Sequence, residues 1–341
     1  MDEGFPFLLG CNGRGAQASS PERPVSLEEH SIDEQFRLVK ESGVFDYFDR
    51  LPLRSNQGEY EKAMAKYDLP VHTCSWFYML GRDEALLHDN LRICKEVGAS
   101  CHNIMTFTHH ADGHVITDDE IVAHYMDVYE AGDKLGVIPS FELHVNMWTE
   151  QYDRVTPIAK RIQGMGVPFH YTMDYSHVIF KIGDDQEQDI SHCREAVAKG
   201  DMVLDPFEAG SLCQEWLDLG MVKWIQLRTV GPNQPRNAWA LDEQGEPGRG
   251  IQYPIVPPKA GEWHSPWHAY MVEPSKEAIR LALRYHLRNP GSPLRYITTE
   301  MINLIDYGLN AKYNLFEQNV AAARFIRQAW KEEQALFKAG L

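Results

Sequence analysis

Residues 117–145 read TDDEIVAHYMDVYEAGDKLGVIPSFELHV and contain a helical pattern followed at once by a strand pattern. Thr117 and Glu120 have the spacing of a capping box, and Gly136 stands where a glycine often ends a helix. The apolar run at 137–145 follows without a long loop. A helix joined in this way to a buried strand is typical of a parallel β/α fold.

The same alternation recurs along the chain of 341 residues. We expect a capping box at Ser26–Glu29 to open the first helix, and helices at 82–97, 206–219, 274–287 and, last and longest, 314–338. Eight runs have strand character: 5–10, 44–48, 70–77, 101–107, 137–145, 168–174, 222–229 and 294–300. Eight strands alternating with helices predict a (β/α)8 TIM barrel that forms a single domain over residues 1–341.

The segment 231–273 interrupts this alternation and is rich in Pro, Gly and Trp. It follows the seventh predicted strand, so it belongs to the C-terminal face of the barrel, where active sites of this fold lie. Its aromatic content argues against disorder. We interpret this insertion as a lid or substrate wall, with a subunit contact as the alternative.

Composition excludes several classes of protein. The net charge of −16 opposes binding to phosphate backbones, so no nucleic-acid partner is expected. No apolar run approaches the roughly 20 residues that cross a bilayer, and the acidic start Met1–Gly4 lacks a secretory signal. The six cysteines contain no CxxC pair and are interpreted as reduced. These features favour a cytoplasmic enzyme or binding protein.

Each of the last four predicted strands carries a polar side chain near its end that a barrel core would not select: Glu142, Asp174, Gln226 and Glu300. Side chains alternate between the two faces of a strand, so His144 and Asn146 share a face with Glu142, and Arg228 shares one with Gln226. The ends of parallel barrel strands meet at one mouth. We therefore expect these side chains to converge there.

Three carboxylates and an amide oxygen at one mouth predict a divalent cation. The carboxylates would repel one another without it, and oxygen-rich ligands suit Mg²⁺ or Mn²⁺ better than zinc. The alternative for each acid taken singly is an ordinary salt bridge. The predicted metal ligands are Glu142, Asp174, Gln226 and Glu300.

With these residues the chain resembles the sugar phosphate isomerase/epimerase superfamily, the xylose isomerase-like TIM barrels. That family holds a metal with Glu on the fifth strand, Asp on the sixth, His on the seventh and Glu on the eighth. Glu142, Asp174 and Glu300 match this pattern, and Asp174 to His177 fits the family's Asp-x-x-His motif. Gln226 stands where the family has histidine, a departure that bears on the identity of the metal.

The resemblance implies one divalent metal, with Mn²⁺ expected and Mg²⁺ or Co²⁺ as alternatives. The metal stabilises the enediolate formed when a C–H beside a sugar carbonyl is deprotonated. Glu142 and Glu300 are then ligands, one or both of which also move protons, and His144 and His177 are further acid–base candidates. Substrate oxygens are expected at His177, Arg228 and Asn146.

Residues 142–148 and the insertion also resemble the larger subunit of bacterial C-glycoside deglycosidases. These Mn²⁺ enzymes cleave the carbon–carbon bond between a 3-keto sugar and an aromatic aglycone, and a small β-rich subunit completes them. The resemblance implies cleavage of 3-keto C-glucosides, with Trp263 and Trp267 among the aromatic residues of the substrate wall. The long helix 314–338 further favours an oligomer.

Two other functions remain open. An isomerase, epimerase or dehydratase of a free sugar or inositol ketone would exchange a C–H with solvent and release no aglycone. A non-catalytic carbohydrate-binding barrel would keep its function in a Glu142→Gln variant. A zinc nuclease of the same barrel type is disfavoured by the charge of −16 and by Gln226. His109 and His110 follow the fourth strand and are further candidates for the mouth.

Overall fold

The fold is a closed barrel of eight parallel strands in sequence order, as predicted. The computed structural model describes residues 4–233, 236–237, 239–249 and 252–341. The strands are β1 (Leu8–Asn12), β2 (Tyr47–Asp49), β3 (Val71–Tyr78), β4 (Cys101–Thr106), β5 (Ile138–Glu142), β6 (Tyr171–Asp174), β7 (Val222–Leu227) and β8 (Tyr296–Thr299). β1 pairs with β8 and closes the barrel.

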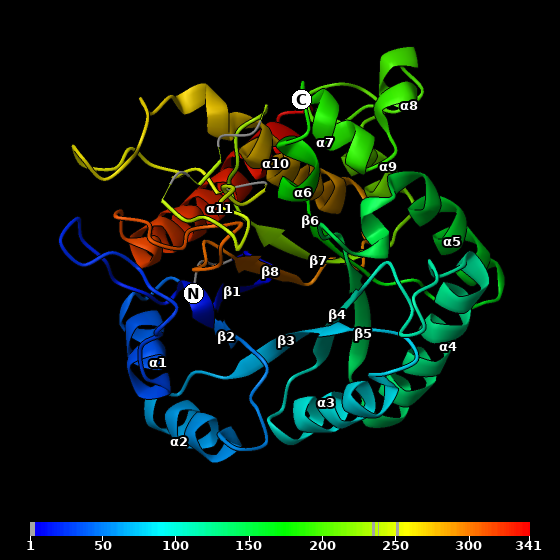
Figure 1. Ribbon diagram of the computed structural model, residues 1–341, viewed down its shortest axis with the longest axis horizontal. Helices are drawn as coiled ribbons and strands as arrows, with labels where there is room; N and C mark the ends of the chain where they lie inside the picture. The colour runs from blue at the N-terminus through cyan, green and yellow to red at the C-terminus, as the bar shows by residue number, and fades with distance from the viewer. Residues whose placement is uncertain (1–3, 234–235, 238, 250–251) are drawn as a thin grey trace.

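The helices surround these strands, with α1 to α5 forming an arc around the barrel in Figure 1. They are α1 (Ile32–Glu41), α2 (Gln57–Tyr67), α3 (Glu84–Glu96), α4 (Asp118–Leu135), α5 (Tyr152–Gly164), α6 (Ser176–Ile179), α7 (Asp185–Ile190), α8 (Arg194–Lys199), α9 (Leu212–Asp218), α10 (Glu273–Arg288) and α11 (Leu315–Lys338). Short 3-10 turns lie at η1 (Gly13–Gly15), η2 (Trp148–Glu150) and η3 (Ala269–Val272). Among the described residues, no helix has the length and apolarity needed to cross a membrane.

The barrel interior below the mouth is filled by bulky side chains. Tyr47, Cys101, Trp224 and Tyr296 form a buried cluster inside the strands. The Tyr47 hydroxyl lies 2.7 Å from the hydroxyl of Thr298, and Trp224 donates a hydrogen bond of 3.0 Å to the same oxygen. Because side chains alternate along a strand, the next inward position toward the carboxyl end faces the mouth.

The expected capping box at Ser26–Glu29 is wrong. Helix α1 begins at Ile32, and Ser31 is its N-cap, accepting a hydrogen bond from the backbone N–H of Glu34. Ser26 instead forms a local turn with the backbone N–H of Glu28, and Glu29 forms ion pairs with Arg14 and Arg50. Short polar side chains satisfy turns as readily as helix ends, so the four-residue pattern was ambiguous. The capping box of Thr117 and Glu120 is confirmed.

Two further boundaries differ from the sequence prediction. The helix expected at 206–219 is limited to α9, which Ser211 caps, and the short helices α6, α7 and α8 were not predicted. The fifth strand ends at Glu142 rather than at residue 145. Asn146 has a left-handed backbone with φ of 66° and an exposed side chain, so it does not continue the inward face of β5.

Candidate functional site

The predicted carboxylates meet at the barrel mouth. Glu142 ends β5, Asp174 ends β6, and Glu300 directly follows β8. One oxygen from each lies within 4.8 Å of the others, and all three side chains are buried. The fold thus brings three carboxyl groups together from residues that are far apart in the sequence.

The environment of the mouth shifts the pKa of Glu142 and the pKa of Glu300. Burial and the nearby charge of Asp174 raise the pKa of Glu142 well above its usual value, and burial and the charge of Glu142 do the same to the pKa of Glu300. Asn103 donates a hydrogen bond to Glu142, and Asn12 donates one of 3.0 Å to Glu300. A divalent cation at this position would favour the ionised form of both acids.

Gln226 completes an oxygen-rich donor set. Its Nε2 donates a hydrogen bond of 3.1 Å to Glu300, which leaves the amide oxygen Oε1 as the candidate ligand. That oxygen is buried and has no hydrogen-bond partner among the residues that the structure describes. A buried acceptor without a partner is costly unless something else satisfies it. Three carboxylates and this amide oxygen therefore fit a hard divalent cation.

Asp174 and Arg228 form a buried pair behind the carboxylates. Arg228 donates hydrogen bonds of 3.3 Å and 3.0 Å to Oδ2 of Asp174, while Ser176 donates to Oδ1. The guanidinium also lies 3.8 Å from the centre of the Tyr307 ring. Arg228 lines neither of the two mouth cavities described below, so in this structure it positions Asp174 rather than facing open space.

His144 and His177 lie side by side, with ring centres 4.3 Å apart. Nδ1 of His144 lies 2.7 Å from the carbonyl oxygen of Val145, which only accepts, so Nδ1 carries the proton. Nε2 is then an acceptor, and the Tyr307 hydroxyl lies 2.7 Å from it. Burial lowers the pKa of His144 to about 4. Burial and the charge of Arg228 lower the pKa of His177 well below its usual value. Both rings are therefore neutral bases near pH 7.

The two histidines also form an alternative ligand group. One atom each from Glu142, His144 and His177 lies within 4.8 Å of the others. The hydrogen bond between Nε2 of His144 and Tyr307 engages one of these nitrogens, and Arg228 lies 2.8 Å from Nε2 of His177. The group of Glu142, Asp174 and Glu300 is the better candidate, because the unpartnered oxygen of Gln226 supports it.

Two neighbouring cavities lie at the mouth. The polar chamber has a volume of about 230 Å³, and its lining includes Asn12, Asp49, Glu142 and Glu300. The apolar chamber has a volume of about 600 Å³, and its lining includes Phe107, Met147, Leu241 and Ile305. Both are lined by Phe77, His144, Leu304 and Tyr307. His144 and Tyr307 therefore lie at the boundary between a charged space and an apolar one.

The structure separates three predicted substrate residues from the carboxylates. Asn146 lines the apolar chamber, and its side-chain oxygen accepts a hydrogen bond of 2.9 Å from Arg249. Trp263 and Trp267 line neither chamber. Trp263 packs 5.1 Å from the Tyr253 ring, and Trp267 donates a hydrogen bond of 2.8 Å to the carbonyl oxygen of Pro254. In the structure these two indoles hold the insertion together.

Sequence reasoning missed Asp49 and Tyr307. Burial raises the pKa of Asp49 to about 7. Its buried Oδ2 has no hydrogen-bond partner within the described part of the chain, and Asp49 lines the polar chamber. The second strand was predicted to end at residue 48, one position too early to include it. Tyr307 lies in the segment between β8 and α11, where the sequence has no periodicity from which the direction of a side chain could be predicted. A polar residue directly after a predicted strand was the available signal for Asp49.

A buried ionic cluster attaches the insertion to the barrel. Arg249 forms ion pairs of 2.6 Å with both Glu150 and Glu187, and Lys181 forms one of 2.6 Å with Glu150. Lys181 and Glu187 are fully buried. The backbone N–H of Arg249 also donates to Asp306, the neighbour of Tyr307. The described part of the insertion is thereby linked to the segment that carries Tyr307.

Comparisons with known proteins agree on the fold. No family model and no curated protein matches the chain. A xylose isomerase-like TIM barrel protein from Mycobacterium smegmatis in complex with magnesium is 15% identical, with a TM-score of 0.51, and the match covers 97% of this chain and 100% of that one. This chain has the xylose isomerase-like TIM-barrel fold. The predicted fold resemblance is confirmed.

Two other structures of this fold are enzymes by name. The apo 3-keto-D-glucoside 4-epimerase YcjR from E. coli is 13% identical, with a TM-score of 0.50 and coverage of 94% of this chain and 99% of that one. The probable 3-DHS dehydratase AsbF from Bacillus anthracis is 8% identical, with a TM-score of 0.54 and coverage of 94% and 98%. At such identities the xylose isomerase-like fold is shared, and the reaction must be argued from the site.

Proposed function

We propose that this chain is a divalent-metal-dependent enzyme that acts on a keto-sugar or a sugar glycoside. The observation that carries the proposal is the convergence of Glu142, Asp174 and Glu300 beside the unpartnered amide oxygen of Gln226. When bound, the cation supplies Lewis acidity that stabilises negative charge developing on a sugar carbonyl oxygen. Mn²⁺ is the proposed metal, with Mg²⁺ and Co²⁺ as alternatives.

The proposed acid–base groups line the polar chamber or the boundary between the two chambers. Tyr307 lines both chambers and donates to Nε2 of His144, so a proton taken from substrate reaches the neutral imidazole through the phenol. Glu142 and Glu300 both line the polar chamber and are placed to take a proton from carbon on a bound sugar. Arg228 and His177 keep Asp174 in position.

The more specific proposal is cleavage of the carbon–carbon bond of a 3-keto C-glucoside. A glycoside of this kind has a polar sugar and an aromatic aglycone, and the mouth offers a polar and an apolar chamber with His144 between them. The sugar would bind beside the carboxylates and the aglycone against Phe107 and Leu241. A small partner subunit, as in the enzymes that the sequence resembles, belongs to this proposal.

The alternative is an epimerase, isomerase or dehydratase of a free keto-sugar. It is supported by the shared fold of YcjR, whose name gives a 3-keto-D-glucoside as substrate, and of AsbF, a probable dehydratase. Such an enzyme uses the polar chamber and leaves the apolar chamber to solvent or to a substituent. The two reactions share the deprotonation of a C–H beside a carbonyl, and they differ in whether an aglycone leaves.

Metal analysis tests the shared part of the proposal. We expect about one Mn or Mg per chain in the purified protein, and loss of the ion in Glu142→Gln, Asp174→Asn and Glu300→Gln. Glu333→Gln is a matched control, because Glu333 is a buried carboxylate on α11 outside the mouth. Failure of the wild-type protein to bind any supplied divalent metal would remove the catalytic proposal and leave only the fold.

Substrate assays then separate the two reactions. Incubation with a 3-keto C-glucoside, with and without a candidate partner subunit, is expected to release the aglycone. A second incubation, with a free keto-sugar in deuterated solvent, detects exchange of the C–H beside the carbonyl with solvent. Exchange without aglycone release would establish the epimerase-type alternative, and neither signal in a metal-loaded protein would contradict both.

A further inference from the structure

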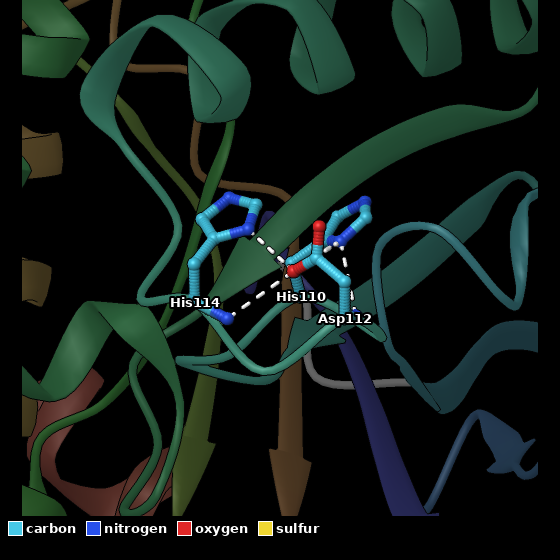
Figure 2. A group of neighbouring side chains, drawn as sticks. All are labelled: His110, Asp112 and His114. Atoms are coloured by element: carbon cyan, nitrogen blue, oxygen red, sulfur yellow. Dashed lines mark hydrogen bonds and ion pairs between the residues drawn. The ribbon is translucent and has the colours of Figure 1, made fainter.

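The loop between β4 and α4 brings two imidazoles and a carboxylate together at the molecular surface (Figure 2). His110, Asp112 and His114 alternate along a tight turn in which the backbone N–H of His110 donates to the carbonyl oxygen of His114. One ligand atom from each of the three side chains lies within 4.8 Å of the others. These residues take no part in the site described above and line neither chamber.

The carboxylate of Asp112 lies between the two rings. Its Oδ1 is 3.1 Å from Nδ1 of His110 and 2.5 Å from Nδ1 of His114. Zinc–ligand bonds of about 2.0–2.2 Å in a tetrahedron separate the ligand atoms by about 3.4 Å. To bind one ion together with Oδ1 of Asp112, each imidazole nitrogen must therefore move away from that oxygen by less than about 1 Å. Asp112 and His114 are exposed and can make this adjustment, while the half-buried His110 needs only the smaller shift.

A carboxylate orients the His114 ring from its other side. Nε2 of His114 lies 2.9 Å and 3.1 Å from the two carboxylate oxygens of Glu120. Metal-binding histidines commonly donate their second ring N–H to a carboxylate in this way, which directs the free nitrogen toward the ion. Glu120 is itself fixed by the capping box at the start of α4. The orienting group is thus part of a regular helix end.

Packing holds the His110 ring as well. A Cβ atom built on Gly81 would lie 2.3 Å from Nε2 of this ring, so the ring packs directly against the Gly81 backbone. Gly81 also has a φ of +81°, a conformation that favours glycine. The two imidazoles are therefore positioned by independent neighbours, one from the β3–α3 connection and one from α4.

We propose that His110, Asp112 and His114 form a second metal site, which binds Zn²⁺ with open coordination positions toward solvent. Two imidazoles and one carboxylate select a transition metal over Mg²⁺ or Ca²⁺, in contrast to the all-oxygen donor set of the barrel mouth. The site is distinct from the proposed catalytic one and does not depend on it. Its ion closes the turn that follows Phe107, a residue that lines the apolar chamber.

Zinc titration of the chelator-stripped full-length chain tests the site. We expect His110→Ala and His114→Ala each to bind one Zn²⁺ fewer per chain than the wild-type protein. Glu120→Gln is expected to lower the affinity for this Zn²⁺ by about 10- to 100-fold, because Glu120 orients His114 and does not bind the ion itself. Asp112→Asn is expected to weaken it as well.

His109→Ala is the matched control, because His109 is an exposed neighbour outside the cluster. We expect it to bind zinc as the wild-type protein does. Equal stoichiometry in the wild-type, His110→Ala and His114→Ala proteins would overturn the proposal. Loss of one bound Zn²⁺ in His109→Ala would also overturn the proposal. Zinc binding would then depend on the number of surface histidines and not on the cluster of His110, Asp112 and His114. The histidine and aspartate variants lie on a surface turn and Glu120→Gln lies at the start of α4, so the melting temperature of each variant without metal verifies its folding. All of these variants keep the carboxylates of the barrel mouth. The difference in zinc stoichiometry between the variants and the wild-type protein therefore tests the surface site even if the mouth binds no metal.

Discussion

The hydroxyl of Tyr307 lies 2.7 Å from Nε2 of His144, and the Tyr307 ring stacks on the guanidinium of Arg228. Tyr307 thus contacts a neutral base through its oxygen and a permanent cation through its ring. Burial raises the pKa of Tyr307 well above its usual value, so the phenol keeps its proton at neutral pH. The phenol is therefore a donor to His144 until the imidazole receives a proton.

Removal of this hydroxyl tests the proton relay. We expect Tyr307→Phe to lower kcat at least about 100-fold on a 3-keto C-glucoside, the lower end of what a positioned acid–base group contributes. The retained ring keeps the stack on Arg228, so the metal content should not change. Tyr313→Phe is the control, because Tyr313 is also buried and hydrogen-bonded but lies outside both chambers. Wild-type kcat in Tyr307→Phe would exclude the relay.

Gln226 provides a test of the metal ligands that needs no substrate. Gln226→Leu removes the unpartnered oxygen and the hydrogen bond to Glu300, and we expect Mn²⁺ affinity to fall by about 10- to 100-fold. Gln226→His supplies an imidazole and should restore binding. Competition with a chelating dye measures both. Unchanged affinity in the leucine variant would place the ion elsewhere.

The cluster that attaches the insertion predicts a dependence of stability on pH. Burial alone would raise the pKa of Glu150, but the charges of Lys181 and Arg249 outweigh it and lower the pKa to about 2 from the usual 4.5. A depressed carboxyl pKa stabilises the fold above about pH 4.5 and loses this effect as the pH falls toward 2. The contribution at pH 7 is about 3 kcal/mol.

Chemical denaturation of the wild-type protein and Glu150→Gln at two pH values measures this effect. The difference in unfolding free energy between the two proteins should be about 2 kcal/mol larger at pH 7 than at pH 3. A difference that does not depend on pH would show that Glu150 is not held ionised by its neighbours.

Loss of Arg249 should release the insertion. Arg249→Ala leaves Glu150 and Glu187 buried with less opposite charge, and we expect a destabilisation on the order of 3 kcal/mol. Limited proteolysis should then cut within residues 231–273 faster than in the wild-type protein. Arg161→Ala removes an exposed ion pair with Asp119 and is expected to cost less than about 1 kcal/mol. Equal effects of the two changes would contradict a specific role for the cluster.

The apolar chamber gives a test of substrate class. Leu241 belongs to the insertion, is exposed and lines this chamber. We expect Leu241→Ser to raise KM for an aromatic 3-keto C-glucoside about 5- to 20-fold, as one lost apolar contact would. KM for a free keto-sugar should stay the same. An equal change for both substrates would argue against an aglycone in this chamber.

The barrel and its carboxylates were predictable because regular strands carry a simple pattern. Side chains alternate along a strand, so Glu142 and Asp174 could be assigned to the mouth from their positions alone. The predicted inward position of Asn146 was wrong, because β5 ends at Glu142 and the backbone at Asn146 is left-handed. Tyr307 and Arg249 lie on loops and contact His144 and Asn146, which are far away in the sequence. A local pattern of side chains does not predict contacts of this kind.

The proposed ligands and part of the apolar chamber belong to different parts of the chain, and this separation has a consequence for the evolution of such a protein. The proposed ligands lie on or directly after β5 to β8, whereas residues 241–243 of the apolar chamber belong to the insertion. Mutations that lengthen or replace this insertion alter which substituents fit without moving a ligand. A change in the insertion can therefore alter the substrate specificity, while the proposed metal-assisted step at the barrel mouth is retained.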